Sequence, residues 1–161
     1  MSFFPRNRFQ WKSADISADL DKLASITVTD DEINAVAGLP ANFTITPAAG
    51  ASTVCEITIQ ANDANNDKLT HVAPLLVWLS DDAAGVGLTT TAASGNVQAK
   101  AGSTDLSALT AKKALLVQTS ATGVYVLSIT DSSKTLFKVC VQSLGGGVPA
   151  VATLTTDDYG A

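Results

Sequence analysis

The residues of this chain that could act as nucleophiles, general bases or metal ligands are few and far apart. It contains one histidine, His71, and two cysteines, Cys55 and Cys140. A serine or cysteine nucleophile needs a neighbouring base, most often histidine, and a zinc site needs about four closely spaced ligands. Since the chain meets neither requirement, we interpret His71 as a surface residue and expect no enzyme, no metal site and no cofactor.

Paired carboxylates, which glycoside hydrolysis requires, have local explanations here. Asp30–Glu32 completes a helix-capping box, whereas Asp81–Asp82 and Asp157–Asp158 fall in a loop and near the end of the sequence. Asn62–Asp67 offers several oxygen atoms but lacks the bidentate glutamate of a calcium loop. We interpret these acids as solvated cap and turn residues.

The two cysteines occupy opposite phases of their predicted strands. Cys55 alternates in step with Ile57 and Ile59, while Cys140 is out of step with Phe137 and Val139. In a strand, successive side chains point to opposite faces of the sheet. The sulfur atoms therefore face different ways, and we predict two free thiols.

The first twelve residues combine aromatic and cationic side chains with no acid, and they hold four of the nine aromatic residues of the chain. Aromatic side chains provide anchor area at interfaces, and arginine provides directional pairing with acidic surfaces. We therefore predict a docking arm in preference to a segment folded back on its own domain. Its partner-binding residues are Phe3, Phe4, Arg6, Arg8, Phe9, Trp11 and Lys12.

The overall charge and hydropathy exclude other classes of partner. A net charge of −5 and a pI near 4.6 argue against nucleic acid, whose phosphates require clustered cations. No apolar run approaches the roughly 20 residues that cross a bilayer, so we expect no membrane partner. No secretory signal is visible, which favours folding in a cytoplasm.

Two short helices are expected between the arm and the first strand. The first begins at Ser13, and its apolar residues recur at helical spacing: Ile16, Leu20 and Leu23. The second begins at the capping box Thr29–Glu32 and ends at Gly38. Because neither helix is long enough to be stable alone, we predict that residues 1–42 form one attachment module.

Residues 43–142 alternate apolar and polar side chains between turn clusters, which is typical of short strands. Such spacing predicts a mainly β fold, an immunoglobulin-like antiparallel β-sandwich. The predicted strands are Phe43–Thr46, Thr53–Gln60, Leu75–Ser80, Thr89–Thr91, Asn96–Lys100, Leu115–Thr119, Val124–Thr130 and Thr135–Gln142.

Three finer predictions concern connections and one aromatic residue. Leu115–Thr119 and Val124–Thr130 are expected to form a hairpin. Residues 143–161 are expected to be a glycine-rich joint and a tail, within which Val151–Thr155 adds an edge strand to its own domain or to a neighbour's. Trp78 lies in an apolar run and is interpreted as core, not as a sugar-stacking platform.

Four segments resemble structural proteins of tailed bacteriophages. Val28–Pro40 (VTDDEINAVAGLP) resembles a helix-and-turn element of phage fibre and head-decoration proteins. The segments that resemble an immunoglobulin-like domain of phage structural proteins are Thr46–Asn65, Val77–Thr89 and Ala121–Phe137. This resemblance covers most of residues 28–142.

The resemblance implies a capsid decoration, cement or head-fibre protein, often a trimer. Its N-terminal part would bind the major capsid protein and its β-domain would project from the phage head, after assembly in the host cytoplasm. Two alternatives stay open: a tail-fibre, baseplate or host-adhesion protein, and a carbohydrate-binding module that recognises a host-surface glycan.

Overall fold

The computed structural model describes residues 39–161, which lie within the compact unit Ala35–Ala161. The predicted docking arm and the two predicted helices fall in residues 1–38, outside the described residues. The structure therefore tests the predicted β-domain and the C-terminal region that follows it.

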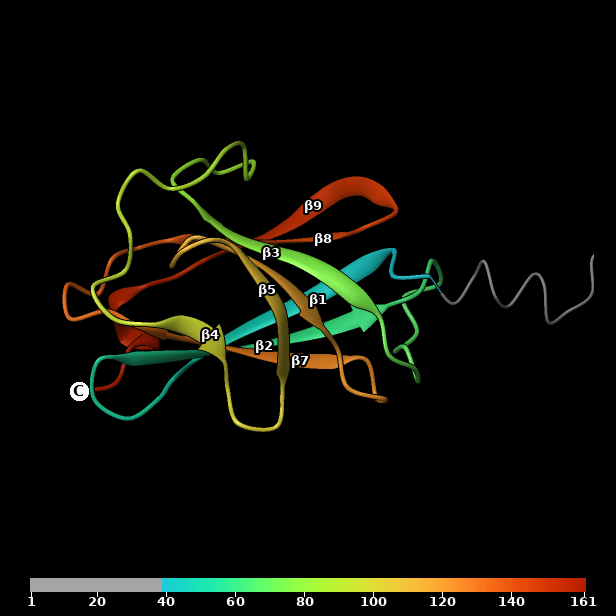
Figure 1. The fold of residues 1–161 in the computed structure, drawn as a ribbon, viewed down its shortest axis with the longest axis horizontal. Helices are drawn as coiled ribbons and strands as arrows, with labels where there is room; N and C mark the ends of the chain where they lie inside the picture. Colours follow the sequence, from blue (N-terminus) through green and yellow to red (C-terminus); the bar gives the residue numbers. More distant parts are fainter. Residues whose placement is uncertain (1–38) are drawn as a thin grey trace, which may run out of the picture. The chain divides into compact units, whose positions relative to one another are not determined.

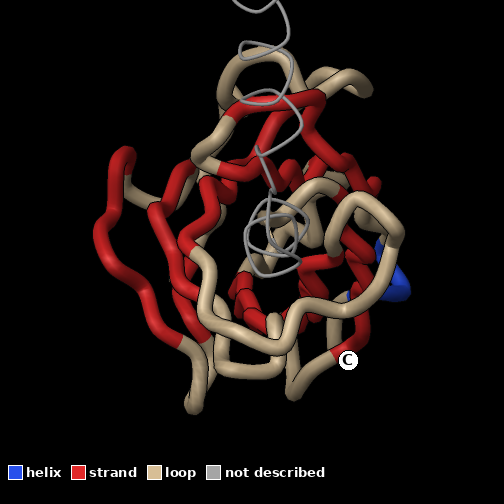
Figure 2. Tube along the Cα trace, turned by 90° about the vertical axis from the view of Figure 1, so that its right-hand side faces the viewer, coloured by secondary structure: helices blue, strands red, loops and turns tan. Residues whose placement is uncertain are grey.

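The described residues form two antiparallel β-sheets, so the prediction of a mainly β fold is confirmed (Figures 1 and 2). The four-stranded sheet has the order β1-β2-β7-β4, formed by Asn42–Ala49, Val54–Asn62, Val124–Thr130 and Val97–Ala99. The five-stranded sheet has the order β5-β6-β3-β8-β9, formed by Thr104–Thr110, Ala114–Gln118, Pro74–Ser80, Lys138–Ser143 and Gly146–Thr153. A short 3-10 helix, η1, spans Thr156–Asp158.

The core lies between the sheets, where every second residue of the central strands is buried. In β7 the side chains of Tyr125, Leu127 and Ile129 are fully buried, while their neighbours are half-buried. Burying one such side chain contributes about 1.5–3 kcal/mol. The neighbouring strand β2 supplies Cys55, Ile57 and Ile59, and strands β3 and β8 of the facing sheet supply Leu75, Val77, Leu79, Val139 and Val141.

The predicted hairpin between residues 115–119 and 124–130 is wrong, because β6 and β7 belong to different sheets. The connecting turn is tight: Ser120 N donates to Val124 O at 2.7 Å, and Gly123 adopts a φ of +71°. A side chain at Gly123 would lie 2.6 Å from Leu69 O. The same turn residues can connect two strands of one sheet or carry the chain from one sheet to the other.

Two other strand predictions fail at the sheet edges. Thr89–Thr91 forms no strand, and Asn96–Lys100 is reduced to the three residues of β4. Strand β5 is missing from the prediction because six of its seven residues are exposed and its pairing with β6 is interrupted by two irregularities. Neither face of β5 therefore carries the alternation that marks a strand.

The predicted joint and tail at 143–161 are folded parts of the domain. Gly146 and Gly147, with φ values of 93° and 102°, begin β9, which pairs with β8 along the edge of the five-stranded sheet. The edge strand predicted near Val151 thus lies in its own domain. Beyond it, Leu154 and Tyr159 are buried in the core, and Gly160 N donates to Val54 O at 3.0 Å.

We predict that Tyr159→Ala destabilises the protein by about 3–5 kcal/mol, the usual cost of removing a buried aromatic side chain. Tyr159 is 3% exposed, and its hydroxyl donates to Thr135 O at 2.7 Å. Tyr159→Phe keeps the ring and should cost only about 1 kcal/mol. Urea denaturation measures both, and an unchanged midpoint for Tyr159→Ala would show that these residues are a dispensable tail.

A second stability prediction rests on Asp131, which is 1% exposed beside β7. Burial raises the pKa of its carboxyl group, but hydrogen bonds from Thr135 and Ser94 outweigh that effect and lower the pKa to about 2. The contacts are Thr135 N to Oδ2 at 2.8 Å and Ser94 N to Oδ1 at 3.1 Å. The folded state therefore favours the ionised form.

Because the unfolded-state pKa of aspartate is about 3.9, this carboxylate should contribute about 2.5 kcal/mol above that pH. The contribution is lost as the pH falls through the folded-state value. We expect the difference in unfolding free energy between the wild type and Asp131→Asn to shrink from pH 5 to pH 2 in urea titrations. A difference that stays constant would contradict this assignment.

Candidate functional site

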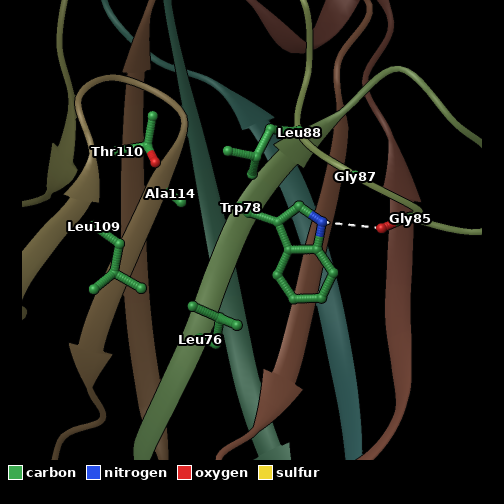
Figure 3. A pocket seen from close by; sticks show the side chains of 8 residues that line it. All are labelled: Leu76, Trp78, Gly85, Gly87, Leu88, Leu109, Thr110 and Ala114. Carbon is green, nitrogen blue, oxygen red and sulfur yellow. Dashed lines mark hydrogen bonds between the residues drawn. The ribbon is translucent and has the colours of Figure 1, made fainter.

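The strongest candidate for a functional surface is an apolar groove on the outer face of the five-stranded sheet, around Trp78 (Figure 3). Val77 and Leu79 point into the core, each 1% exposed, so the intervening Trp78 points outward and is half-buried. The prediction that Trp78 is a core residue is therefore wrong. The run Leu75–Leu79 is apolar on both faces, and its composition alone does not distinguish them.

The loop after β3 folds back over this outer face. Trp78 Nε1 donates to Gly85 O at 3.0 Å, which joins the strand to the loop (Figure 3). Gly85 adopts a φ of +74°, and a side chain there would lie 2.9 Å from Cys140 Sγ. The Asp82 carboxylate accepts hydrogen bonds from the backbone of Ala84, at 2.8 Å, and of Val86. The loop thus has a fixed shape and covers Cys140 from outside.

The groove has a volume of about 370 Å³ and is lined by residues of three strands and the loop. Thr110 is the only polar side chain among the lining residues, and the indole N–H of Trp78 is already hydrogen-bonded. The groove therefore offers a ligand or partner almost exclusively apolar contacts. Its lining residues are Leu76, Trp78, Gly85, Gly87, Leu88, Leu109, Thr110 and Ala114 (Figure 3).

Hydrogen bonds to Asp81 fix the segment that follows Leu88. The Asp81 carboxylate accepts hydrogen bonds from Thr89 Oγ1 at 2.6 Å and from Thr90 N at 2.8 Å. The hydrogen bond from Thr89, followed by those from Thr90, lowers the pKa of Asp81. Lys113 Nζ donates to the carbonyl oxygens of Thr89 and Thr90 at 2.8 and 2.9 Å. This wall of the groove is therefore formed before any partner binds.

The apolar surface extends beyond the groove along the edge of the sheet. Leu88 is 43% exposed, Leu109 is 56% exposed and Leu106, on the same strand as Leu109, is 47% exposed. Large apolar side chains grouped on a surface mark interaction sites more often than scattered ones do. Sequence reasoning missed this surface; the one available signal was the lack of alternation in residues 75–79.

The residues considered for catalysis or metal binding are not brought together. His71 is exposed, as predicted. Within residues 39–161, no group of three or more histidine, cysteine or acidic residues is arranged to hold a metal ion. In the suspected calcium loop, Asp63 Oδ1 accepts the backbone N–H groups of Asn65 and Asp67, both at 2.9 Å. These hydrogen bonds close a turn, which gives the Asp63 carboxylate a structural role.

Comparison with known proteins gives no family. No protein-family description matches the chain, and no curated protein matches it. Within residues 39–161, no helix is long and apolar enough to cross a membrane. The predicted docking residues Phe3 to Lys12 lie outside the described residues, so the groove is the interaction surface that can be analysed in atomic detail.

Both cysteines are free and buried, which confirms the prediction of free thiols. Burial raises the pKa of Cys55 to about 12 and that of Cys140 to about 11. Because the thiolate is the reactive form, we predict that neither cysteine reacts with a thiol reagent in the native protein at pH 7.5. Two equivalents should react in denaturant. Rapid native labelling of Cys140 would show that the loop over it opens readily.

Proposed function

We propose that this chain is a structural protein of a tailed-phage virion. It binds the major capsid protein through its N-terminal region, decorates or cements the head, and displays the β-sandwich on the outside. The virion setting is supported by the resemblance of segments between Val28 and Phe137 to phage structural proteins. The single observation that carries an assembly role is the preformed apolar groove on the outer face of the sandwich.

We also propose that the sandwich belongs to the immunoglobulin-like class. The order β1-β2-β7-β4 corresponds to strands A-B-E-D, and β9-β8-β3-β6-β5 corresponds to G-F-C-C′-C″ of a variable-type domain. The connectivity differs in one region, because the chain runs through β4, β5 and β6 in the order D, C″, C′. The proposed likeness therefore rests on the strands that form the centre of both sheets.

Trp78 and Cys140 depart from the antibody pattern, because both lie on the outer face of their sheet and not in the core. In antibody domains a buried tryptophan of strand C packs on a disulfide between strands B and F. Here Trp78 of β3 and Cys140 of β8 are cross-strand partners on the outer face, while Cys55 of β2 points inward. The aliphatic side chains of the core fill the place of the disulfide.

The groove supports the homo-oligomer part of the proposal, with a second copy of this chain as its occupant. Leu109 lines the groove and is also more than half exposed, and Leu106 is exposed on the same edge strand. The same edge therefore carries both a hollow and exposed leucine side chains, so each copy can insert a leucine side chain into the groove of the next copy. A closed ring such as a trimer uses such contacts head to tail.

The alternative of a carbohydrate-binding module centred on Trp78 is weakened by the composition of the groove. A sugar platform needs polar groups around the aromatic ring to bind the hydroxyl groups. The groove has one polar side chain, Thr110, and the Trp78 N–H is bound to Gly85. A tail-fibre, baseplate or host-adhesion protein stays the main rival, since it would use the same attachment and display.

The capsid-docking proposal is tested with a chain that lacks residues 1–12. We expect it to keep the circular dichroism spectrum of a folded β-protein and to lose binding to purified heads in a sedimentation assay. The arm supplies the anchor residues of the proposed contact, whereas the described β-domain begins after it. Binding equal to that of the full chain would refute docking by the arm.

The proposed self-association through the groove is tested with Leu109→Asp, whose oligomeric state is measured by light scattering. Since Leu109 is exposed, the monomer should stay folded while self-association weakens. If the variant associates as the wild type does, the groove is not part of the contact between copies. Binding of the full chain to tail components but not to heads would favour the tail-protein alternative.

A further inference from the structure

A second pocket, of different chemistry, lies on the outer face of the four-stranded sheet. It has a volume of about 390 Å³ and opens beside β1, β2 and the turn after β2. Thr58 and Gln60 alternate with the buried Ile57 and Ile59, so their side chains lie on the outer face. The pocket is lined by Thr44, Thr58, Gln60, Asn62, Asn66 and Lys68.

The base of this pocket is held by one buried amide. Asn62 is 3% exposed, and its Nδ2 donates to Thr44 Oγ1 at 3.2 Å and to Asn66 Oδ1 at 3.4 Å. Asn66 has a φ of +67°, a left-handed conformation that asparagine tolerates better than most residues. The Asp63 carboxylate fixes the same turn through two backbone N–H groups. The polar groups are therefore set in place by the fold.

The opposite wall is fixed by Gln60. Its Nε2 donates to three backbone carbonyl oxygens: that of Ala61 at 2.8 Å, and those of Thr122 and Gly123 at 3.3 Å. These contacts attach the side chain to the turn between β6 and β7 and restrict its rotation. Because the amide nitrogen is bound, the oxygen Oε1 is left as a fixed acceptor.

The remaining hydrogen-bonding capacity of the pocket is mixed. Gln60 Oε1 can accept, while Asn66 Nδ2 and the hydroxyl groups of Thr44 and Thr58 can donate. Lys68 adds an ammonium group. Within residues 39–161, every fully buried side-chain nitrogen or oxygen atom has a hydrogen-bond partner. The free capacity therefore belongs to atoms that water, or a ligand in its place, can reach.

We propose that this pocket binds an uncharged saccharide. Each sugar hydroxyl group both donates and accepts, which matches a rigid set of amides and hydroxyls. The methyl groups of Thr44 and Thr58 and the stem of Lys68 offer contacts to sugar carbons. An anionic ligand fits less well, because Asp63 and Asp67 lie in the turn that carries Asn66.

The binding is weak at a single site, because no aromatic ring lines the pocket. We expect a dissociation constant in the millimolar range, which corresponds to about −4 kcal/mol. Several copies on one particle would strengthen attachment to a glycan surface without any new contact. This inference concerns the β-domain itself and holds whether or not the chain belongs to a phage head.

The test is an NMR titration of the full-length protein, labelled with ¹⁵N, against the methyl glycosides of glucose, galactose, mannose and N-acetylglucosamine. The side-chain NH₂ signals of Gln60, Asn62 and Asn66 report directly on the pocket. We expect at least one glycoside to shift them in a saturable way. If none of the four does so at concentrations up to about 50 mM, above the millimolar range expected for such a site, the proposal is overturned.

Two variants and one control locate the binding. Asn66→Gly preserves the left-handed turn and removes the amide, and Thr58→Val removes an exposed hydroxyl at nearly constant shape. Each should weaken binding about fivefold, the loss expected for one hydrogen bond. Asn65→Gly alters the same turn outside the pocket and should bind as the wild type does. Unchanged binding by the Asn66→Gly, Thr58→Val double variant would overturn the proposal.

Discussion

A partly buried contact between the two sheets fixes the position of the edge strand β5. The Tyr125 hydroxyl of β7 donates to Asp105 Oδ1 of β5 at 2.6 Å, and Ala99 N of β4 donates to Asp105 Oδ2 at 2.8 Å. Burial, with the hydrogen bond to Asp105, raises the pKa of Tyr125, so the phenol keeps its proton. Asp105 thus holds β5 to two strands of the opposite sheet.

The contact of Asp105 bears on the groove because β5 is an edge strand, paired with a neighbour on one side only. Its remaining residues are exposed, and its pairing with β6 is irregular. Yet β5 supplies Leu109 and Thr110 to the groove. A hydrogen bond between the sheets therefore helps to position an apolar surface on the outside of the domain.

The parts of the fold that the sequence predicted are those with one buried and one solvated face. Strands β2 and β7 alternate cleanly and were predicted almost to the residue. Strand β3 was found, but the orientation of Trp78 was not, since a loop shields its second face. The β6–β7 hairpin prediction is wrong because both strands pair with strands elsewhere along the chain, and β5 was missed because nearly all of its residues are exposed. The groove combines residues of three strands and a loop between residues 76 and 114, so no local pattern predicts it.

The buried end of the described domain has a consequence for how the protein folds. Gly160 N binds Val54 O, Val54 pairs with Thr130, and Tyr159 fills the core between them. Several central pairings of the sandwich, such as β2 with β7 and β3 with β8, also join residues far apart along the chain. Folds dominated by such non-local pairing typically fold in milliseconds to seconds, slower than helical domains of similar size. Until Leu154 and Tyr159 dock, the core residues that they cover stay exposed, and apolar surface exposed during folding favours aggregation.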